Sequence, residues 1–230
     1  MKIIARMHTD FSEKFGIPRQ SGLVENLRGR IVFEPQYRSA DALKGLEEYS
    51  HLWVIWQFSK AQREGWSATV RPPRLGGKKR VGVFASRSPF RPNPIGLSSV
   101  KMDGIVMDEK LGPVICVSGI DMLDGTPIYD IKPYLSYCDS HPEAKDGFAQ
   151  RVKDRKLKVQ WEVTLPEEMK EDKFGEVHRE TITKLLAQDP RTAYLDDEDR
   201  IWGMTYAGYN IKFKVKEDTV CIVEIKWADK

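Results

Sequence analysis

The amino-acid sequence predicts a mainly β protein with some α-helix, built as a small β-barrel followed by a small α+β domain. Three observations indicate this. Apolar and β-branched residues alternate in short runs over the first half, Gly and Pro separate these runs, and residues 141–154 are polar without apolar periodicity. The last observation marks a domain boundary, so we expect a barrel domain over residues 1–145 and an α+β domain over residues 146–230.

Short strands dominate the predicted barrel domain, over residues 3–7, 51–58, 81–85, 97–102 and 114–118. Residues 51–58 form a nearly continuous apolar run, so we expect that strand to be buried on both faces. Helical spacing and Ser39 as a candidate N-cap predict one short helix over residues 39–46. Many short strands with turn residues between them favour a closed or nearly closed barrel.

The second domain contains strand and helix patterns together. Residues 156–163 alternate between polar and apolar side chains, which is typical of an amphipathic strand. Residues 167–188 have helical character, with an apolar side that contains Ile182. The segments 210–216 and 220–225 alternate on either side of Glu217 and predict a β-hairpin.

Composition excludes several classes of protein. Of the 230 residues, 40% are hydrophobic and 31% are charged, as in a soluble globular chain. No apolar run approaches the ~18 to 20 residues of a bilayer span, and no apolar segment after Met1 indicates a secretory signal. The three cysteines are far apart and odd in number, so they predict no disulfide framework and indicate a reducing cytoplasm.

Common catalytic motifs are absent from the sequence. The four histidines form no H-E-x-x-H motif and no cluster with cysteine, so we expect no metal site. There is no G-x-S-x-G elbow, and the segment 76–79 lacks the leading glycine and the ending of a phosphate-binding loop. No G-x-G-x-x-G motif follows a strand, which argues against a Rossmann nucleotide site.

Basic residues are concentrated between residues 60 and 101, where ten Lys and Arg stand against one acidic residue, Glu64. Such a stripe can hold a polyanion, because each neutralised phosphate releases counterions. The same stripe can be a solvated loop that keeps the protein soluble. The net charge of +3 does not decide between these interpretations.

Two loops carry polar residues on a backbone that proline restrains. In residues 15–22, Pro18 precedes Arg19 and Gln20, which either aims these side chains at a ligand or forms an ordinary turn. In residues 85–98, three prolines within six residues hold Arg87, Arg91 and Asn93 in fixed directions. Preorganised polar groups favour a binding site, and a rigid structural connector is the alternative.

A third loop covers residues 121–134. Asp124 and Gly125 indicate a turn, and Ile128 and Ile131 after it bracket the acidic Asp130. The amides of this turn could meet a ribose or an amino-acid carboxylate. A hairpin in which Asp130 pairs with a basic residue explains the same pattern.

These segments together resemble the TsaA/TrmO family of S-adenosylmethionine-dependent tRNA methyltransferases. The motif at residues 81–98 reads Val-Gly-Val-Phe-Ala-Ser-Arg-Ser-Pro-Phe-Arg-Pro-Asn-Pro-Ile-Gly-Leu-Ser. The resemblance continues through residues 18–20, 70–77, 124–134 and 187–194. It implies a barrel that binds S-adenosylmethionine without a Rossmann sheet, a C-terminal α+β domain and a homodimer.

The resemblance also implies the residues that bind the cofactor. Ser59 and Lys60 stand where relatives often carry His-Gln, and the downstream Asp-Ser pair reads Asp139-Ser140. The implied cofactor-binding residues are Pro18, Arg19, Gln20, Ser59, Lys60, Arg87, Leu97, Asp124, Gly125, Thr126 and Pro127.

The implied reaction moves a methyl group from S-adenosylmethionine to N6 of threonylcarbamoyladenosine at position 37 of tRNA, next to the anticodon. As hypotheses, Asp130 takes the proton of the acceptor nitrogen, Asn93 orients it, and Arg91 or Lys132 pairs with the threonyl carboxylate. The expected tRNA-binding residues are Arg71, Arg74, Lys78, Lys79, Arg80, Arg91 and Lys132.

Two other functions remain open from the sequence. A barrel with a basic loop could bind RNA without catalysis. A methyltransferase that uses S-adenosylmethionine could also act on a small metabolite or on a protein.

Overall fold

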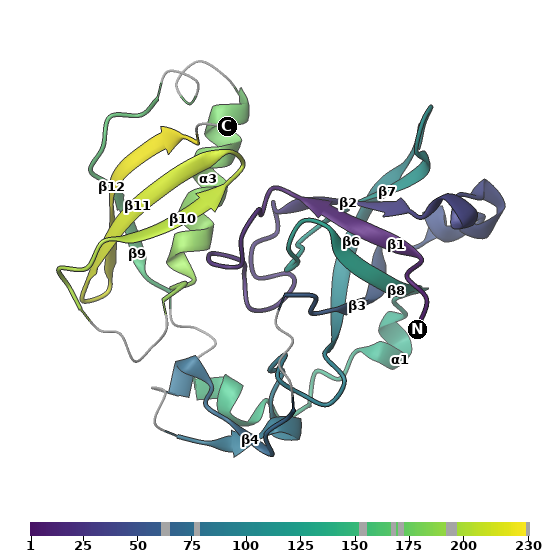
Figure 1. Ribbon diagram of the computed structural model, residues 1–230, viewed down its shortest axis with the longest axis horizontal. Helices are drawn as coiled ribbons and strands as arrows, with labels where there is room; N and C mark the ends of the chain where they lie inside the picture. The colour runs from purple at the N-terminus through teal and green to yellow at the C-terminus, as the bar shows by residue number, and fades with distance from the viewer. Residues whose placement is uncertain are drawn as a thin grey trace.

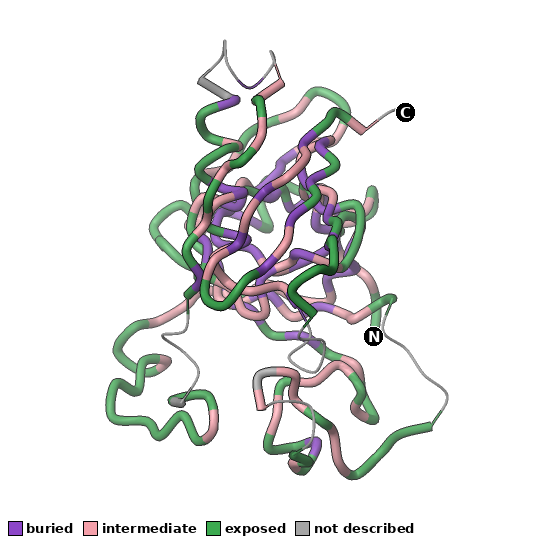
Figure 2. Tube along the Cα trace, turned by 90° about the vertical axis from the view of Figure 1, so that its left-hand side faces the viewer, coloured by how far each residue is buried: buried purple, intermediate pink, exposed green. Residues whose placement is uncertain are grey.

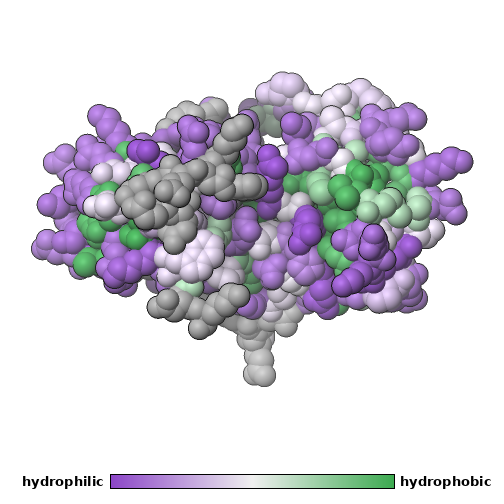
Figure 3. Space-filling view, turned by 90° about the horizontal axis from the view of Figure 1, so that it is seen from above, coloured by the Kyte–Doolittle hydropathy of each residue, from purple (hydrophilic) through white to green (hydrophobic). Residues whose placement is uncertain are grey.

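The computed structural model describes residues 1–60, 65–75, 79–151, 156–166, 169, 173–191 and 197–228. It confirms the predicted class, because a closed β-barrel forms one half of the molecule and a four-stranded sheet with a helix forms the other (Figure 1). Buried residues gather in the middle of the molecule, and the segments that project below it are mostly exposed or intermediate (Figure 2). Seen from above, the surface is mostly hydrophilic, with separate hydrophobic patches over the two halves (Figure 3).

The barrel closes through six antiparallel strands in the order β1-β2-β7-β6-β3-β8. Closure pairs both edges of every strand, so no edge is left open in the barrel. Alternate residues point inward, as Leu52, Val54 and Trp56 do from the third strand. The strands are β1 Ala5–Thr9, β2 Arg28–Phe33, β3 His51–Gln57, β6 Ile95–Asp108, β7 Gly112–Ser118 and β8 Thr126–Pro133.

Three long connections leave the barrel at the same end, because neighbouring strands run in opposite directions. They are residues 10–27, 58–94 and 119–125, and we call this end of the barrel the rim. Backbone hydrogen bonds tie the first connection to the third, from Gly22 N to Gly119 O at 2.8 Å and from Asp124 N to Phe11 O at 3.0 Å. The three loops that the sequence singles out therefore begin at one end of the barrel.

The C-terminal half is a sheet in the order β10-β11-β12-β9, in which β9 runs parallel to β12. Its strands are β10 Trp202–Tyr206, β11 Tyr209–Lys216, β12 Thr219–Trp227 and β9 Lys158–Trp161, and the helix α3 Lys173–Ala187 contacts it. Ile182 of α3 is fully buried, as the helical spacing predicts. The predicted hairpin around Glu217 is confirmed.

The first rim connection packs directly against the C-terminal sheet. The ring of Phe11 lies 5.2 Å from that of Tyr206, and Phe15 stacks on Trp202 at 6.0 Å. Thr205 N donates to Glu13 Oε1 at 2.8 Å. The two halves share one hydrophobic core, so the C-terminal sheet is held beside the rim. The division at residues 145 and 146 stays a prediction.

Two expectations about local structure are wrong. Residues 39–46 form two short 3-10 turns, η2 Ala40–Leu43 and η3 Leu46–Glu48, because Gly45 between them adopts a left-handed φ of 84°. The strand β3 is not buried on both faces, because only alternate residues point into the barrel and the others lie on its partly exposed outer wall.

Other predicted elements change in length. The strand expected at residues 81–85 is only β5 Val81–Gly82, which pairs with the unpredicted β4 Thr69–Val70 and continues into a 3-10 turn, η5 Val83–Ala85. The strand expected at 156–163 is the shorter β9, and β2, β8 and β10 had not been predicted. The remaining short elements are η1 Pro35–Tyr37, η4 Pro73–Leu75, α1 Ser136–Asp139 and η6 Gly147–Arg151.

Gly96 is required by the packing at the mouth of the barrel. A Cβ atom at this position would lie 2.2 Å from the indole of Trp56, its partner across β3 and β6. We expect Gly96→Ala to lower the free energy of unfolding by about 1–3 kcal/mol, because the indole must move. Gly82→Ala is the matched control, since nothing lies within 4 Å of its added Cβ. Equal urea midpoints for the two variants would contradict this packing.

Candidate active site at the barrel rim

Gln20 and Arg87 bring the first two loops together. Arg87 Nη1 donates a hydrogen bond to Gln20 Oε1, and Gln20 Nε2 donates to the carbonyl of Arg19. Arg87 is exposed, so the contact holds a guanidinium group at the surface of the rim. The rim thus presents a fixed positive charge beside an amide.

Beneath this pair, a chain of hydrogen bonds runs from the barrel interior to Asp121. Trp56 Nε1 donates to Ser98 Oγ at 3.0 Å, and Ser98 Oγ donates to Asp121 Oδ1 at 2.7 Å. Burial raises the pKa of Asp121 to about 6, against opposing contributions from Ser98 and from the charge of Arg87. Asp121 is a residue of this region that the sequence motifs do not predict. The one signal for it in the sequence is a carboxylate between the apolar Ile120 and Met122, three residues after the strand expected at 114–118.

The raised pKa of Asp121 predicts a pH-dependent stability. Between about pH 4 and about pH 6 the unfolded chain loses this proton before the folded chain, so the folded state loses stability as pH rises. Relative to Asp121→Asn, the wild-type free energy of unfolding should fall by about 2 kcal/mol from about pH 4 to about pH 7. Urea unfolding across this range measures the difference.

A constant difference between the two proteins would contradict the buried carboxyl at Asp121. Asp108→Asn serves as a control of opposite sign. The backbone N–H groups of Leu111 and Lys110 lower the pKa of Asp108, so its contribution to stability is lost as pH falls.

The third loop joins the rim through the turn at Asp124. Asp124 Oδ1 accepts Thr9 N at 3.0 Å and lies 3.2 Å from His8 Nδ1. Arg6 Nη1 donates to Gly125 O at 3.3 Å. The Asp124 side chain remains half-exposed, whereas Thr126 and Pro127 are buried. Among the predicted cofactor-binding residues of this turn, Asp124 therefore has the side chain that reaches the surface.

The outer wall below the rim places Leu97 and Asp130 in one row. Leu97 and Asp130 are the register partners of Ile55 on its two sides. Strands lie about 4.8 Å apart, so the two backbones are separated by roughly 10 Å. Leu97 is 56% exposed. An apolar side chain and a carboxylate therefore share one open surface.

Asp130 pairs with a basic residue, as the hairpin interpretation expects. Its Oδ2 lies 3.4 Å from Lys132 Nζ, and both side chains are about half-exposed. Pairs this exposed contribute roughly 0–1 kcal/mol, so the contact leaves Asp130 able to exchange partners. The ion pair with Lys132 is therefore compatible with a role of Asp130 as a proton acceptor.

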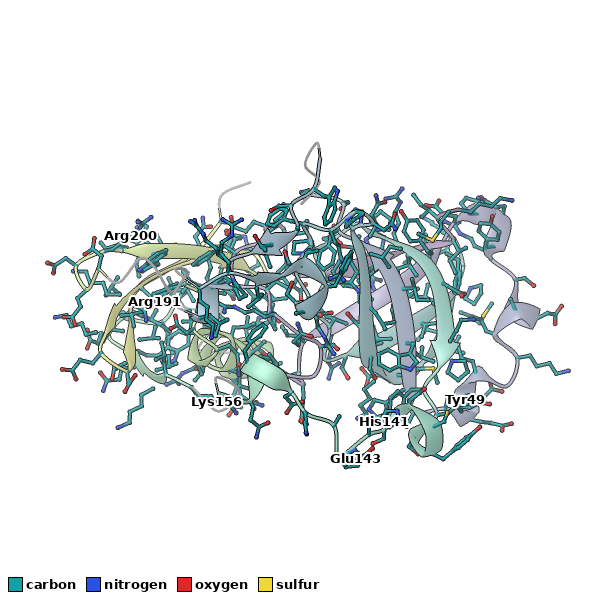
Figure 4. All side chains as sticks on the ribbon, turned by 90° about the horizontal axis from the view of Figure 1, so that it is seen from below. Tyr49, His141, Glu143, Lys156, Arg191 and Arg200 are labelled. Carbon is teal, nitrogen blue, oxygen red and sulfur yellow. The ribbon has the colours of Figure 1, made fainter. Side chains whose placement is uncertain are left out.

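The side chains of Arg19 and Arg91 donate to backbone carbonyls. Arg19 Nη2 donates to the carbonyl of Arg191 at 2.9 Å, in the half that carries the C-terminal sheet (Figure 4). Arg91 Nη1 donates to the carbonyls of Ser86 at 2.9 Å and Ser88 at 3.4 Å, so it braces its own loop.

The remaining cofactor and orienting residues also lie on the rim. Ser59 and Lys60 follow β3 directly and are exposed. Asn93 is exposed just before β6, where its carbonyl accepts Ile95 N at 2.8 Å. Pro18 is buried beside the C-terminal half.

The basic stripe forms a short two-stranded ribbon that projects below the barrel (Figure 1). We call the described residues 65–75 and 79–84 the basic ribbon. Arg71, Lys79 and Arg80 are exposed on it, and Arg80 Nε donates to Thr69 Oγ1 at 2.7 Å. Lys78 and the side chain of Arg74 lie outside the described residues.

Two hollows lie near the rim. A pocket of about 220 Å³ between residues 14–19 and residues 185–190 is smaller than the ~300–1,000 Å³ of common ligand sites. A shallower hollow beside α3 mixes both signs of charge, with Arg28 and Lys101 against Glu25 and Asp103. The exposed groups around Arg87, Asp124 and Leu97 remain the better candidate site.

Comparisons with known proteins decide the family. The family described as tRNA-methyltransferase O N-terminal domain matches residues 6–140, and the TrmO C-terminal domain matches residues 154–228. The chain belongs to the TrmO family. This TrmO member has a closed barrel in its N-terminal match and the four-stranded sheet in its C-terminal match.

Individual relatives cover between 76% and 97% of this TrmO chain. It is 39% identical to the tRNA (adenine(37)-N6)-methyltransferase of Escherichia coli, over 93% of this chain and 92% of the relative. It is 40% identical to that of Eikenella corrodens, over 76% and 95%. A crystal structure of TrmO from Pseudomonas aeruginosa matches with a TM-score of 0.74 at 32% identity, over 97% and 96% of the two chains.

Two further findings concern the described part of this TrmO chain. No group of three His, Cys, Asp or Glu residues there could hold a metal ion. No helix there is long and apolar enough to cross a membrane.

Proposed function

We propose that this protein transfers the methyl group of S-adenosylmethionine to N6 of adenine 37 in tRNA, with the threonylcarbamoylated adenosine as acceptor. Membership of the TrmO family across both halves of the chain carries this proposal. Relatives of nearly full length are named for the adenine(37)-N6 reaction. A non-enzymatic RNA-binding barrel and a methyltransferase for metabolites or proteins are not favoured by these relatives.

The exposed groups of the rim fit the chemistry of S-adenosylmethionine. Its amino-acid carboxylate suits the Arg87 guanidinium, and its ribose or ammonium group suits the Asp124 carboxylate. Leu97 offers an apolar surface for the adenine. When bound, this cofactor supplies an electrophilic methyl group on a positively charged sulfur. The chain must align the two reactants and exclude water.

The acceptor nitrogen is a poor nucleophile, because its lone pair is delocalised into the purine and the urea carbonyl. Asp130 is proposed to accept the proton of this nitrogen, and Asn93 is proposed to orient the nitrogen. Lys132 is favoured over Arg91 for the threonyl carboxylate, because Arg91 is engaged by two carbonyls of its own loop and Lys132 is exposed beside Asp130.

The basic ribbon is proposed to hold phosphates of the anticodon arm. Reversing charge with Lys79→Glu and Arg80→Glu should weaken tRNA binding and lower the salt-dependence slope by about 1 per residue. The matched control is Lys44→Glu with Lys110→Glu, because both lysines are exposed in connections at the opposite end of the barrel. Filter binding at several salt concentrations measures the slopes. Equal slopes for the two double variants would show that the ribbon is a solvated surface that does not bind tRNA.

Mass spectrometry of tRNA nucleosides tests the function. Purified protein, S-adenosylmethionine and unmethylated tRNA should give one added methyl group on N6 of threonylcarbamoyladenosine. Binding of tRNA with no methylation would favour an RNA-binding module. Binding of S-adenosylmethionine without tRNA methylation would favour another acceptor.

We also propose that the protein works in the cytoplasm as a homodimer. Cys116, Cys138 and Cys221 are all free thiols, which suits a reducing compartment. Sedimentation equilibrium measures the oligomeric state, and a monomer at working concentration would reject the dimer.

A further inference from the structure

Two large aromatic side chains stand exposed on the basic ribbon. Trp66 is 57% exposed and Phe84 is 73% exposed. Their ring centroids lie 6.3 Å apart at an interplanar angle of 30°. We call this pair the aromatic shelf. Exposed apolar rings of this size lose the stabilisation of burial, so their grouping on one surface indicates a partner.

The fold of the ribbon holds the shelf in place. β4 and β5 pair Thr69 with Gly82, and Val83 N donates to Ala68 O at 2.9 Å beyond the end of the strands. Trp66 and Phe84 lie just beyond this end of the ladder, where both side chains are exposed. Neither ring belongs to the hydrophobic core of the described residues.

Two arginines lie near the shelf. The guanidinium carbon of Arg91 lies 5.9 Å from the centre of the Phe84 ring, within the range of a cation–π contact. Arg80 is fixed on the same ribbon through Thr69. Aromatic rings beside exposed arginines are the surface on which unpaired bases stack while their phosphates are neutralised.

We propose that Trp66 and Phe84 form a stacking site for unpaired nucleobases of the RNA substrate. This inference rests on the proposed function, in which the modified adenosine lies in the single-stranded anticodon loop. The shelf gives the ribbon a preference for unpaired bases, which its phosphate-binding charges alone do not supply. It belongs to RNA recognition and takes no part in cofactor binding.

The test measures binding of an anticodon stem-loop RNA and of a fully paired RNA hairpin of equal length. The double variant Trp66→Leu with Phe84→Leu should bind the stem-loop about 5- to 150-fold more weakly and the paired hairpin nearly as well as the wild type does. Trp66→Phe with Phe84→Tyr keeps both rings and should retain stem-loop affinity. Trp227→Leu is the matched control, because Trp227 is 52% exposed on β12, away from the ribbon.

Any of four results would overturn the stacking site. The first two are an unchanged stem-loop affinity in the double Leu variant and an equal loss of affinity for both RNAs. The other two are a loss of S-adenosylmethionine binding and a change of oligomeric state, in either case without a selective loss of stem-loop affinity. Wild-type methylation of tRNA, measured in parallel, separates the two proposals. If the wild type methylates tRNA and the Leu variant binds the stem-loop with wild-type affinity, the stacking proposal fails and the proposed function stands. If the wild type neither binds nor methylates tRNA, the proposed function fails with it.

Discussion

Replacing Asp130 with Asn should slow methyl transfer by about 10²- to 10⁴-fold and leave the affinity for S-adenosylmethionine unchanged. The carboxylate lies half-exposed on the outer wall, in the row that contains Leu97. Its Oδ2 pairs with the exposed Lys132, and its Oδ1 accepts Ile131 N at 3.0 Å. An amide of the same shape keeps the packing and loses the ability to accept a proton. Single-turnover methylation of tRNA measures the rate, and calorimetry measures the affinity.

The control for this variant is Asp41→Asn, which removes an exposed carboxylate from η2 at the opposite end of the barrel. It should methylate tRNA at the wild-type rate. If Asp130→Asn also turns over at the wild-type rate, Asp130 is not the proton acceptor. A loss that appears only in cofactor affinity would instead move Asp130 into the binding site.

Arg87→Ala should raise the dissociation constant for S-adenosylmethionine by about 10- to 150-fold, because a hydrogen bond to a charged group contributes about 1.5–3 kcal/mol. The side chain is exposed and linked to Gln20, so its removal should leave the fold intact. Calorimetric titration measures the constant. Arg30→Ala, which removes an exposed arginine from β2, is the matched control.

The Gln20–Arg87 contact adds a sharper test of that prediction. If Gln20 positions Arg87 for the cofactor, Gln20→Ala and Arg87→Ala should be non-additive when they are combined. Additive losses of binding free energy would mean that Gln20 and Arg87 contribute independently to cofactor binding. Wild-type affinity in Arg87→Ala would remove Arg87 from the site.

Patterns that depend on local alternation were predictable from the sequence. The hairpin of β11 and β12 and the barrel class both follow from alternating runs between turn residues. The strand β8 was missed because Pro127 and Pro133 lie at its two ends, where proline is tolerated but resembles a loop signal. The helix expected at 39–46 failed at Gly45, whose left-handed backbone interrupts the helical spacing.

The candidate site was predictable loop by loop but not as a geometry. The prolines in the sequence indicate the segments that contain Arg19, Gln20 and Arg87. They do not predict that Gln20 contacts Arg87 or that Arg19 contacts the C-terminal half. Asp121 was missed because its hydrogen bond to Ser98 exists only after the barrel closes. Such long-range contacts leave no periodic signal in the sequence.

Crosslinking tests most directly the claim that the rim of the barrel seats the cofactor. The protein is irradiated with labelled S-adenosylmethionine, digested and analysed by mass spectrometry to find the labelled peptides. We predict label in peptides from the three rim connections and the strands that follow them, within residues 10–27, 58–98 and 119–130. Label confined to peptides from residues 156–228 would contradict the account.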